Sequence, residues 1–117
     1  MARPTSPRQA AAKLTEFWSP RVIAEVDDAY VKVAKVQGTL AWHSHDAEDE
    51  LFLVLKGRLR IEMAGGDVEL GPGELFVVPR GVEHRPVAVE EAHLMLIEPT
   101  GTANTGDPST AAQRRVV

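Results

Sequence analysis

The chain has 117 residues, enough for one domain with a single hydrophobic core. Hydrophobic residues make up 44% of it and charged residues 26%, a balance typical of a globular protein and not of a disordered one. The net charge of −4 argues against a nucleic-acid-binding protein, which needs a clustered basic surface. Cysteine is absent, which excludes disulfides, thiolate metal ligands and a cysteine nucleophile.

Residues 1–19 are expected to form an N-terminal arm and a short helix. Two prolines and two arginines near the start indicate a frayed end, without the apolar run of a signal peptide. Residues 8–18 are rich in helix formers and place Leu14, Phe17 and Trp18 near one face. No apolar stretch approaches the roughly 18–20 residues of a membrane span. We therefore expect no membrane association and a cytoplasmic location.

Residues 20–99 have the pattern of an all-β domain, in which short strands alternate with turn residues. The segment 50–57, ELFLVLKG, is nearly all apolar and is expected to be a strand buried on both faces. The segment 58–63 alternates, which places Leu59 and Ile61 on the inner face and Arg58 and Arg60 on the outer face. Further strands are expected over 22–26, 30–36, 68–70, 74–79, 85–89 and 92–99, giving eight or nine in all.

That number of evenly spaced strands favours a sandwich, jelly roll or barrel. Gly71-Pro72-Gly73 suits a type II turn with Pro72 and Gly73 at its centre. Residues 100–117 are small and polar, and we expect them to form a flexible C-terminal tail.

Two of the four histidines, His43 and His45, stand two residues apart in WHSHDAEDE. On a strand such residues point to the same face with Cα atoms roughly 6.5 Å apart, so both rings could reach one ion. The alternative is a pair of exposed or core histidines. The acidic loop that follows would reset the strand parity, so that Glu50 enters the next strand facing inward. We interpret Asp46, Glu48 and Asp49 as solvated loop residues.

The remaining histidines have weaker local signals. His84 follows the turn Pro79-Arg80-Gly81 and could be an exposed turn residue. His93 starts the last apolar segment, and we assign it a packing role. Tyr30, Trp42 and Met63 could line a pocket, although packing is the simpler role for each.

The spacing of these residues resembles the first motif of the cupin superfamily. In that motif His-x-His is followed by three or four residues, a Glu, six residues and a Gly. Here His43 and His45 are followed by Glu50 and then Gly57 at those spacings. The sequence before the motif departs from the family pattern, because Gly38 lies one residue too close to His43.

The second cupin motif is Gly, five residues, Pro-x-Gly, two residues and His, and Gly73 and Pro79 lead to His84 in this pattern. Ala88 stands where the family usually has Asn, a position that is not a metal ligand in the family. Fifteen residues separate Gly57 from Gly73, the short spacing of small bacterial cupins. The resemblance covers about residues 22–99, and the nearest named group is the phosphomannose-isomerase-like cupins.

The resemblance implies a cupin-type jelly-roll β-barrel of two antiparallel sheets. It also implies that His43, His45, Glu50 and His84 bind one divalent transition metal ion. Three imidazoles and a carboxylate suit Zn, Fe, Mn, Ni or Co, and the donor types do not choose among them. Members of the family commonly dimerise by packing or exchanging strands, so we expect a homodimer, which the apolar segment 51–55 supports.

Three functions agree with such a site. The first is a small metal-dependent enzyme of isomerase, cyclase or lyase type that acts on a polar oxygenated molecule such as a sugar or keto acid. The second is a metal-dependent dioxygenase acting on a diketone, thiol or phenolic compound. The third is a non-catalytic module that binds a small metabolite. The sequence identifies no catalytic acid or base.

Overall fold

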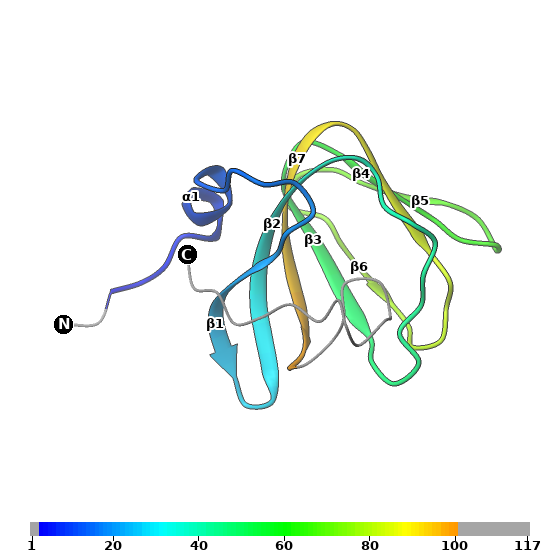
Figure 1. Ribbon diagram of the computed structural model, residues 1–117, viewed down its shortest axis with the longest axis horizontal. Helices are drawn as coiled ribbons and strands as arrows, with labels where there is room; N and C mark the ends of the chain where they lie inside the picture. The colour runs from blue at the N-terminus through cyan, green and yellow to red at the C-terminus, as the bar shows by residue number, and fades with distance from the viewer. Residues whose placement is uncertain (1–2, 101–117) are drawn as a thin grey trace.

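The computed structural model describes residues 3–100, so all of the expected C-terminal tail except Thr100 lies outside the described residues. Within this range every strand pairing is antiparallel, and one short helix precedes the strands (Figure 1). The elements are α1 (Pro7–Ala12), β1 (Arg21–Val26), β2 (Ala29–Thr39), β3 (Glu50–Lys56), β4 (Leu59–Glu62), β5 (Val68–Leu70), β6 (Leu75–Val78) and β7 (Arg85–Pro99). The all-β prediction with a short N-terminal helix is confirmed.

The strands wrap around a common interior as two connected layers (Figure 1). One layer has the strand order β1-β2-β7-β3-β6, and β4 pairs with both β5 and β7 to form the other. β7 belongs to both layers, since Leu96 is in register with Phe52 of β3 and Val87 with Arg60 of β4. The seven strands are thus hydrogen-bonded into one sheet that is bent into two layers, and these layers form the predicted jelly-roll barrel.

β7 is a single strand of 15 residues where the sequence predicted two shorter ones. The register shifts between the pairs Val36↔Ala92 and Gly38↔Ala88, so that one β2 residue opposes three exposed residues, Val89–Glu91. A bulge of this kind bends a strand from one sheet into the next without ending it. The described residues therefore contain seven strands and not eight or nine.

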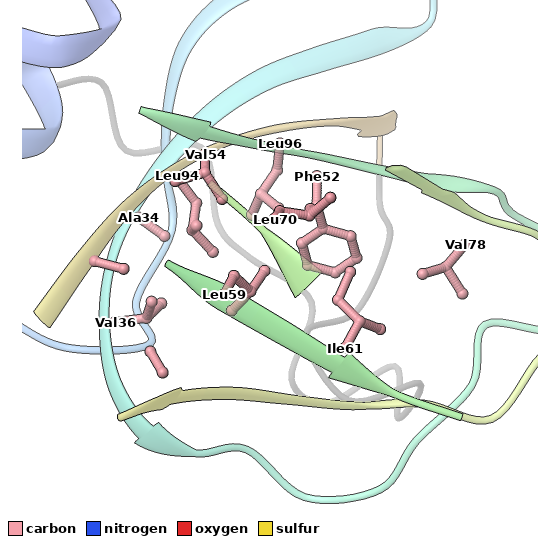
Figure 2. Close-up of a cluster of buried hydrophobic side chains, with 12 residues drawn as sticks. Ala34, Val36, Phe52, Val54, Leu59, Ile61, Leu70, Val78, Leu94 and Leu96 are labelled. Carbon is pink, nitrogen blue, oxygen red and sulfur yellow. The ribbon is translucent and has the colours of Figure 1, made fainter. Parts of the chain in front are cut away.

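The hydrophobic core fills the space between the two layers (Figure 2). Alternation decides which side chains enter it: Leu59 and Ile61 of β4 are buried, while Arg60 between them reaches outward to Glu62 at 3.0 Å. This confirms the interior predicted for that strand. The core residues are Ala34, Val36, Phe52, Val54, Leu59, Ile61, Leu70, Val78, Ala88, Ala92, Leu94 and Leu96.

β3 is fully buried on one face only, contrary to the prediction for the apolar segment 51–55. Phe52 and Val54 point into the core, whereas Leu51, Leu53 and Leu55 lie half-buried on the outer face. α1 covers part of this outer face, where Ala10, Ala11 and Leu14 pack against Val33 of β2 with Leu55 and Ile23 at the edge. The rest of the outer face has no cover from the described residues.

The helix is shorter than the predicted range of 8–18. It starts where the side chain of Ser6 accepts a hydrogen bond from the backbone N–H of Gln9 and Pro7 takes the first helical position. It ends at Ala12, because the chain then runs along β2 and the backbone N–H of Trp18 donates to the Lys35 carbonyl at 2.9 Å. No helix among residues 3–100 is long and apolar enough to cross a membrane.

Two glycines make connections that other residues would strain. Gly73 has φ +82°, and the N–H of Glu74 donates to the Gly71 carbonyl at 3.0 Å, as the predicted type II turn requires. Gly57 has φ +83°, and a Cβ atom there would lie 2.8 Å from the backbone oxygen of Glu91. A side chain at Gly57 would therefore push β7 away from the turn between β3 and β4.

Candidate metal centre

A short backbone pairing brings His43 and His84 together across 41 residues of sequence. The N–H of His43 donates to the His84 carbonyl at 3.0 Å, and the N–H of His84 donates back at 2.9 Å. This isolated bridge is the only strand-like pairing of the described residues 40–49, so the prediction of a regular strand at His43 and His45 is wrong. The same-side orientation is nevertheless right, because both rings are buried and face one another.

Glu50 is the first residue of β3, and its carboxylate is buried in the barrel interior as predicted. The acidic loop before it resets the parity, and Asp46 and Asp49 in this loop are exposed. Asp49 has a structural contact that the sequence did not indicate, because its Oδ1 accepts from the Arg80 N–H at 2.9 Å. This contact joins the loop before Glu50 to the turn before His84.

The turn at Pro79–Gly81 directs His84 inward, as predicted. Gly81 takes φ +78°, and the N–H of Val82 donates to the Pro79 carbonyl at 3.2 Å. The N–H of Gly81 also donates to the His45 carbonyl at 2.8 Å, which ties this turn to the first histidine pair. His84 is fully buried as a result.

The four predicted side chains converge on one point. Each of His43, His45, Glu50 and His84 offers one ligand atom, and these atoms all lie within 4.8 Å of one another. Oε1 of Glu50 is 3.4 Å from Nε2 of His45 and 3.6 Å from Nε2 of His84. The group could hold one metal ion, because these distances are in the range that separates two ligand atoms of the same ion.

Backbone carbonyls orient two of the rings. Nδ1 of His43 lies 2.8 Å from the Ala41 carbonyl, and Nδ1 of His84 lies 3.0 Å from the Val82 carbonyl. A carbonyl oxygen can only accept a hydrogen bond, so each Nδ1 carries the proton and each Nε2 keeps its lone pair. Support of this kind is what metal-binding histidines have in proteins.

Three polar atoms at the centre are buried without a hydrogen-bond partner in the described chain: His45 Nε2, Glu50 Oε1 and His84 Nε2. Leaving a buried polar atom unpaired costs about 1–3 kcal/mol. Three such atoms facing one point are best explained by a cation that they share. The residues present therefore fit a metal ion.

The electrostatics of the centre favour the metal-binding forms of two ligands, His43 and Glu50. Burial lowers the pKa of His43 below its usual value of 6.5. Burial alone would raise the pKa of Glu50, but contacts with His45 and His84 outweigh it and hold that pKa well below its usual range. A neutral imidazole and an ionised carboxylate are the forms that bind metal ions.

The centre opens into a cavity of about 40 Å³ inside the barrel. Its polar lining residues are His43, Glu50 and Glu98, and its other walls are apolar. The sequence did not predict the contribution of Trp18, which lines the cavity and donates from Nε1 to the Gln37 carbonyl at 2.9 Å. The apolar lining residues are Trp18, Pro20, Ala34, Val36, Leu40, Phe52, Pro86, Leu94 and Leu96.

Sequence reasoning also missed a buried pair of polar side chains, Lys32 and Glu98, beside the centre. Nζ of Lys32 lies 2.5 Å from Oε1 of Glu98, and the two side chains are only 1% and 3% exposed. Burial raises the pKa of Glu98 to about 9, and the neighbouring Glu50 adds to the increase while Lys32 opposes it. Parity could have located both residues, because Lys32 shares a face with the buried Ala34 and Glu98 shares one with the buried Leu96.

Other candidates lie outside the centre. Trp42 is exposed and stacks on the Arg85 guanidinium at 5.3 Å, and Met63 packs against the core. Tyr30 is half-buried with its ring 5.9 Å from Nζ of Lys32. His93 is buried on the outer side, where its Nε2 lies 2.8 Å from Oε2 of Glu91, in agreement with a packing role.

Comparison with known proteins agrees with this architecture. A structure of a cupin-2 domain protein from Shewanella frigidimarina is 45% identical, with 75% of this chain and 86% of that chain covered and a TM-score of 0.73. The Neisseria meningitidis protein NMB1881 is 28% identical, with coverage of 83% and 99% and a TM-score of 0.75.

A curated relative of uncharacterised function, YdbB of Bacillus subtilis, is 38% identical over 64 residues. The match covers 54% of this chain and 57% of that protein. The family model described as a cupin domain matches residues 29–98, which include both sequence motifs and all four converging side chains. The chain belongs to the cupin domain family.

Proposed function

We propose that the protein binds one divalent transition metal ion through His43, His45, Glu50 and His84. The three unpaired ligand atoms that face one another inside the barrel carry this proposal. The donor set suits Zn, Fe, Mn, Ni or Co. A bound ion would supply Lewis-acid chemistry, that is, polarisation of a substrate carbonyl or hydroxyl oxygen.

The function that the site supports best is a small metal-dependent enzyme of isomerase or lyase type. The cavity beside the centre favours a compact substrate, because most of its lining is apolar and its volume is about 40 Å³. A sugar would bury several hydroxyl groups against apolar walls, and each unpaired hydroxyl is costly. We therefore favour a small keto or hydroxy acid that binds in the cavity with its oxygen atoms toward the metal centre, where His43 and Glu50 form part of the wall.

Metal analysis of protein purified without added metal tests the assignment. We expect about one equivalent of metal in the wild-type protein and none in His43→Ala, with both proteins folded. His93→Ala is the matched control, because His93 is buried on the opposite side of the sheet and should leave the metal content unchanged. Full metal content in His43→Ala would show that the assignment is wrong.

Metal identity and oxygen uptake then separate the possible activities. The apolar cavity also suits the phenolic substrate of a dioxygenase, which would require iron or nickel and would consume oxygen. Zinc or manganese without oxygen uptake supports the isomerase or lyase. Stabilisation by metabolites without turnover would support a binding module instead.

We also propose that two copies of the chain pair through the outer face of β3 and β6, of which the described residues leave a part uncovered. Leu51 and Leu53 of β3 are half-buried there, and they pair with Val77 (40% exposed) and Leu75 (56% exposed) of the edge strand β6. A second copy presents the same uncharged apolar patch, so a twofold contact would be self-complementary. Exposed apolar patches of this kind mark protein–protein contacts.

A further inference from the structure

The buried pair Lys32–Glu98 requires an explanation beyond packing. Lys32 is on β2 and Glu98 on β7, and they are diagonal neighbours, since Lys32 is in register with Leu96 and Tyr30 with Glu98. Both side chains are almost completely buried. Burying a lysine and a glutamate side chain costs free energy that their interaction often fails to recover, and apolar residues of similar size would stabilise the barrel at least as well. The pair is thus a poor device for stability alone.

Glu98 stands between Lys32 and the metal centre. It lines the same cavity as Glu50, whereas Lys32 does not. Oε1 of Glu98 accepts from Lys32, and its Oε2 has no donor within the described chain. Glu50 and Glu98 are the residues next to the cross-strand pair Leu51↔Ile97, and both side chains are buried and line the same cavity, so they are neighbours across the strands.

Glu50 consequently has contacts on two sides. Its Oε1 faces Nε2 of His45 and Nε2 of His84, and Glu98 is its neighbour across β3 and β7 on the cavity side. Carboxylates that bind metal ions are generally held by a second group of this kind. Without Glu98, the side chain of Glu50 could rotate into the cavity.

We propose that Lys32 and Glu98 act as positioning residues that keep Glu50 turned toward the histidines. Lys32 fixes one oxygen of Glu98, and Glu98 blocks rotation of Glu50. This inference rests on the proposed function, because it concerns the ligand geometry of the same centre. Loss of such supporting groups typically weakens metal binding about 10–100-fold.

The double variant Lys32→Met/Glu98→Leu separates positioning from stability. Removing both charges leaves no buried charge unpaired, so we expect the barrel to remain folded, with thermal stability equal to or above that of the wild-type apoprotein. We expect its dissociation constant for Zn²⁺, measured by chelator competition, to rise about 10–100-fold. The visible spectrum of the Co²⁺ form should also change, since it reports coordination geometry. Wild-type affinity in a folded double variant would overturn the inference.

Glu98→Gln provides a conservative rescue. Its amide can donate to Glu50 while its carbonyl accepts from Lys32, so we expect Zn²⁺ affinity close to that of the wild type. A loss as large as in the double variant would contradict positioning by hydrogen bonds. Lys35→Met is the matched control, because Lys35 is on the same strand as Lys32 but its Nζ lies 3.8 Å from Oε2 of the half-exposed Glu91 and not beside Glu98. If the wild-type protein itself fails to bind Zn²⁺, the proposed function fails, whereas equal affinity in all variants defeats only the positioning role.

Discussion

Replacing His84 with alanine should remove metal binding while leaving the barrel folded. The backbone bridge with His43 does not involve the ring, so the loop geometry should persist. Loss of the ring opens space beside Phe52, whose ring centroid lies 6.1 Å away, and such truncation costs about 2 kcal/mol. Removing the unpaired Nε2 of His84 recovers about 1–3 kcal/mol, so the two effects nearly cancel in the apoprotein.

The two proteins should differ when metal is added. Free Zn²⁺ at about 100 times the dissociation constant stabilises the wild-type fold by about 2.7 kcal/mol. For a chain of this size, this corresponds to a rise in Tm of about 10 °C. Differential scanning calorimetry with and without Zn²⁺ should show that rise in the wild type and almost none in His84→Ala. An equal rise in both proteins would refute the assignment of His84.

Three further predictions follow from single features. Because burial lowers the pKa of His43, this side chain takes up a proton in the unfolded chain, but not in the folded one, as pH falls through 6.5. The stability of the apoprotein, measured by urea unfolding, should therefore decrease below that pH, and it should decrease less in His43→Gln. Gly57→Ala should lower the free energy of unfolding by about 2 kcal/mol or more in excess of the loss caused by Gly73→Ala. Both glycines have positive φ, but only at Gly57 would the new Cβ atom clash with a backbone oxygen, that of Glu91 at 2.8 Å. Leu53→Lys should separate the proposed dimer and so halve the molecular mass measured by light scattering. Val89→Lys is the control and should leave the mass unchanged, because Val89 is 78% exposed on the β7 bend, away from the proposed contact. A monomeric wild type would exclude the proposed dimer.

The four converging side chains were predicted through the resemblance to the cupin motifs, because each histidine had only a weak signal in its local sequence. His43 and His45 are two residues apart, and the turn before His84 has a proline and a glycine that specify its shape. The type II turn at Gly73 was predictable for the same reason, since few residues adopt its φ angle. The shape of these turns depends on nearby residues, whereas the bridge between His43 and His84 depends on residues far apart in the sequence.

Features that depend on distant pairing were missed. The bend in β7 arises from its register with β2, which the polar residues Glu90 and Glu91 do not specify by themselves. Trp18 lies outside the helix, and its backbone N–H donates to the Lys35 carbonyl. A helical pattern in the sequence does not predict this hydrogen bond to β2. The partners Lys32 and Glu98 are 66 residues apart, so neither charge indicates the other until the two strands are paired.

The charges around the cavity bear on the ligand that the centre would accept. A divalent ion with three neutral imidazoles and the Glu50 carboxylate would carry one net positive charge. In a cavity with mostly apolar walls, this charge is best balanced by a monoanion that also chelates the ion. Calorimetric titration of the Zn²⁺-loaded protein should therefore show at least about tenfold tighter binding of glycolate than of the neutral ethylene glycol, or about 1.4 kcal/mol. Equal affinities would contradict this charge balance and would favour a neutral substrate such as a sugar over a hydroxy acid.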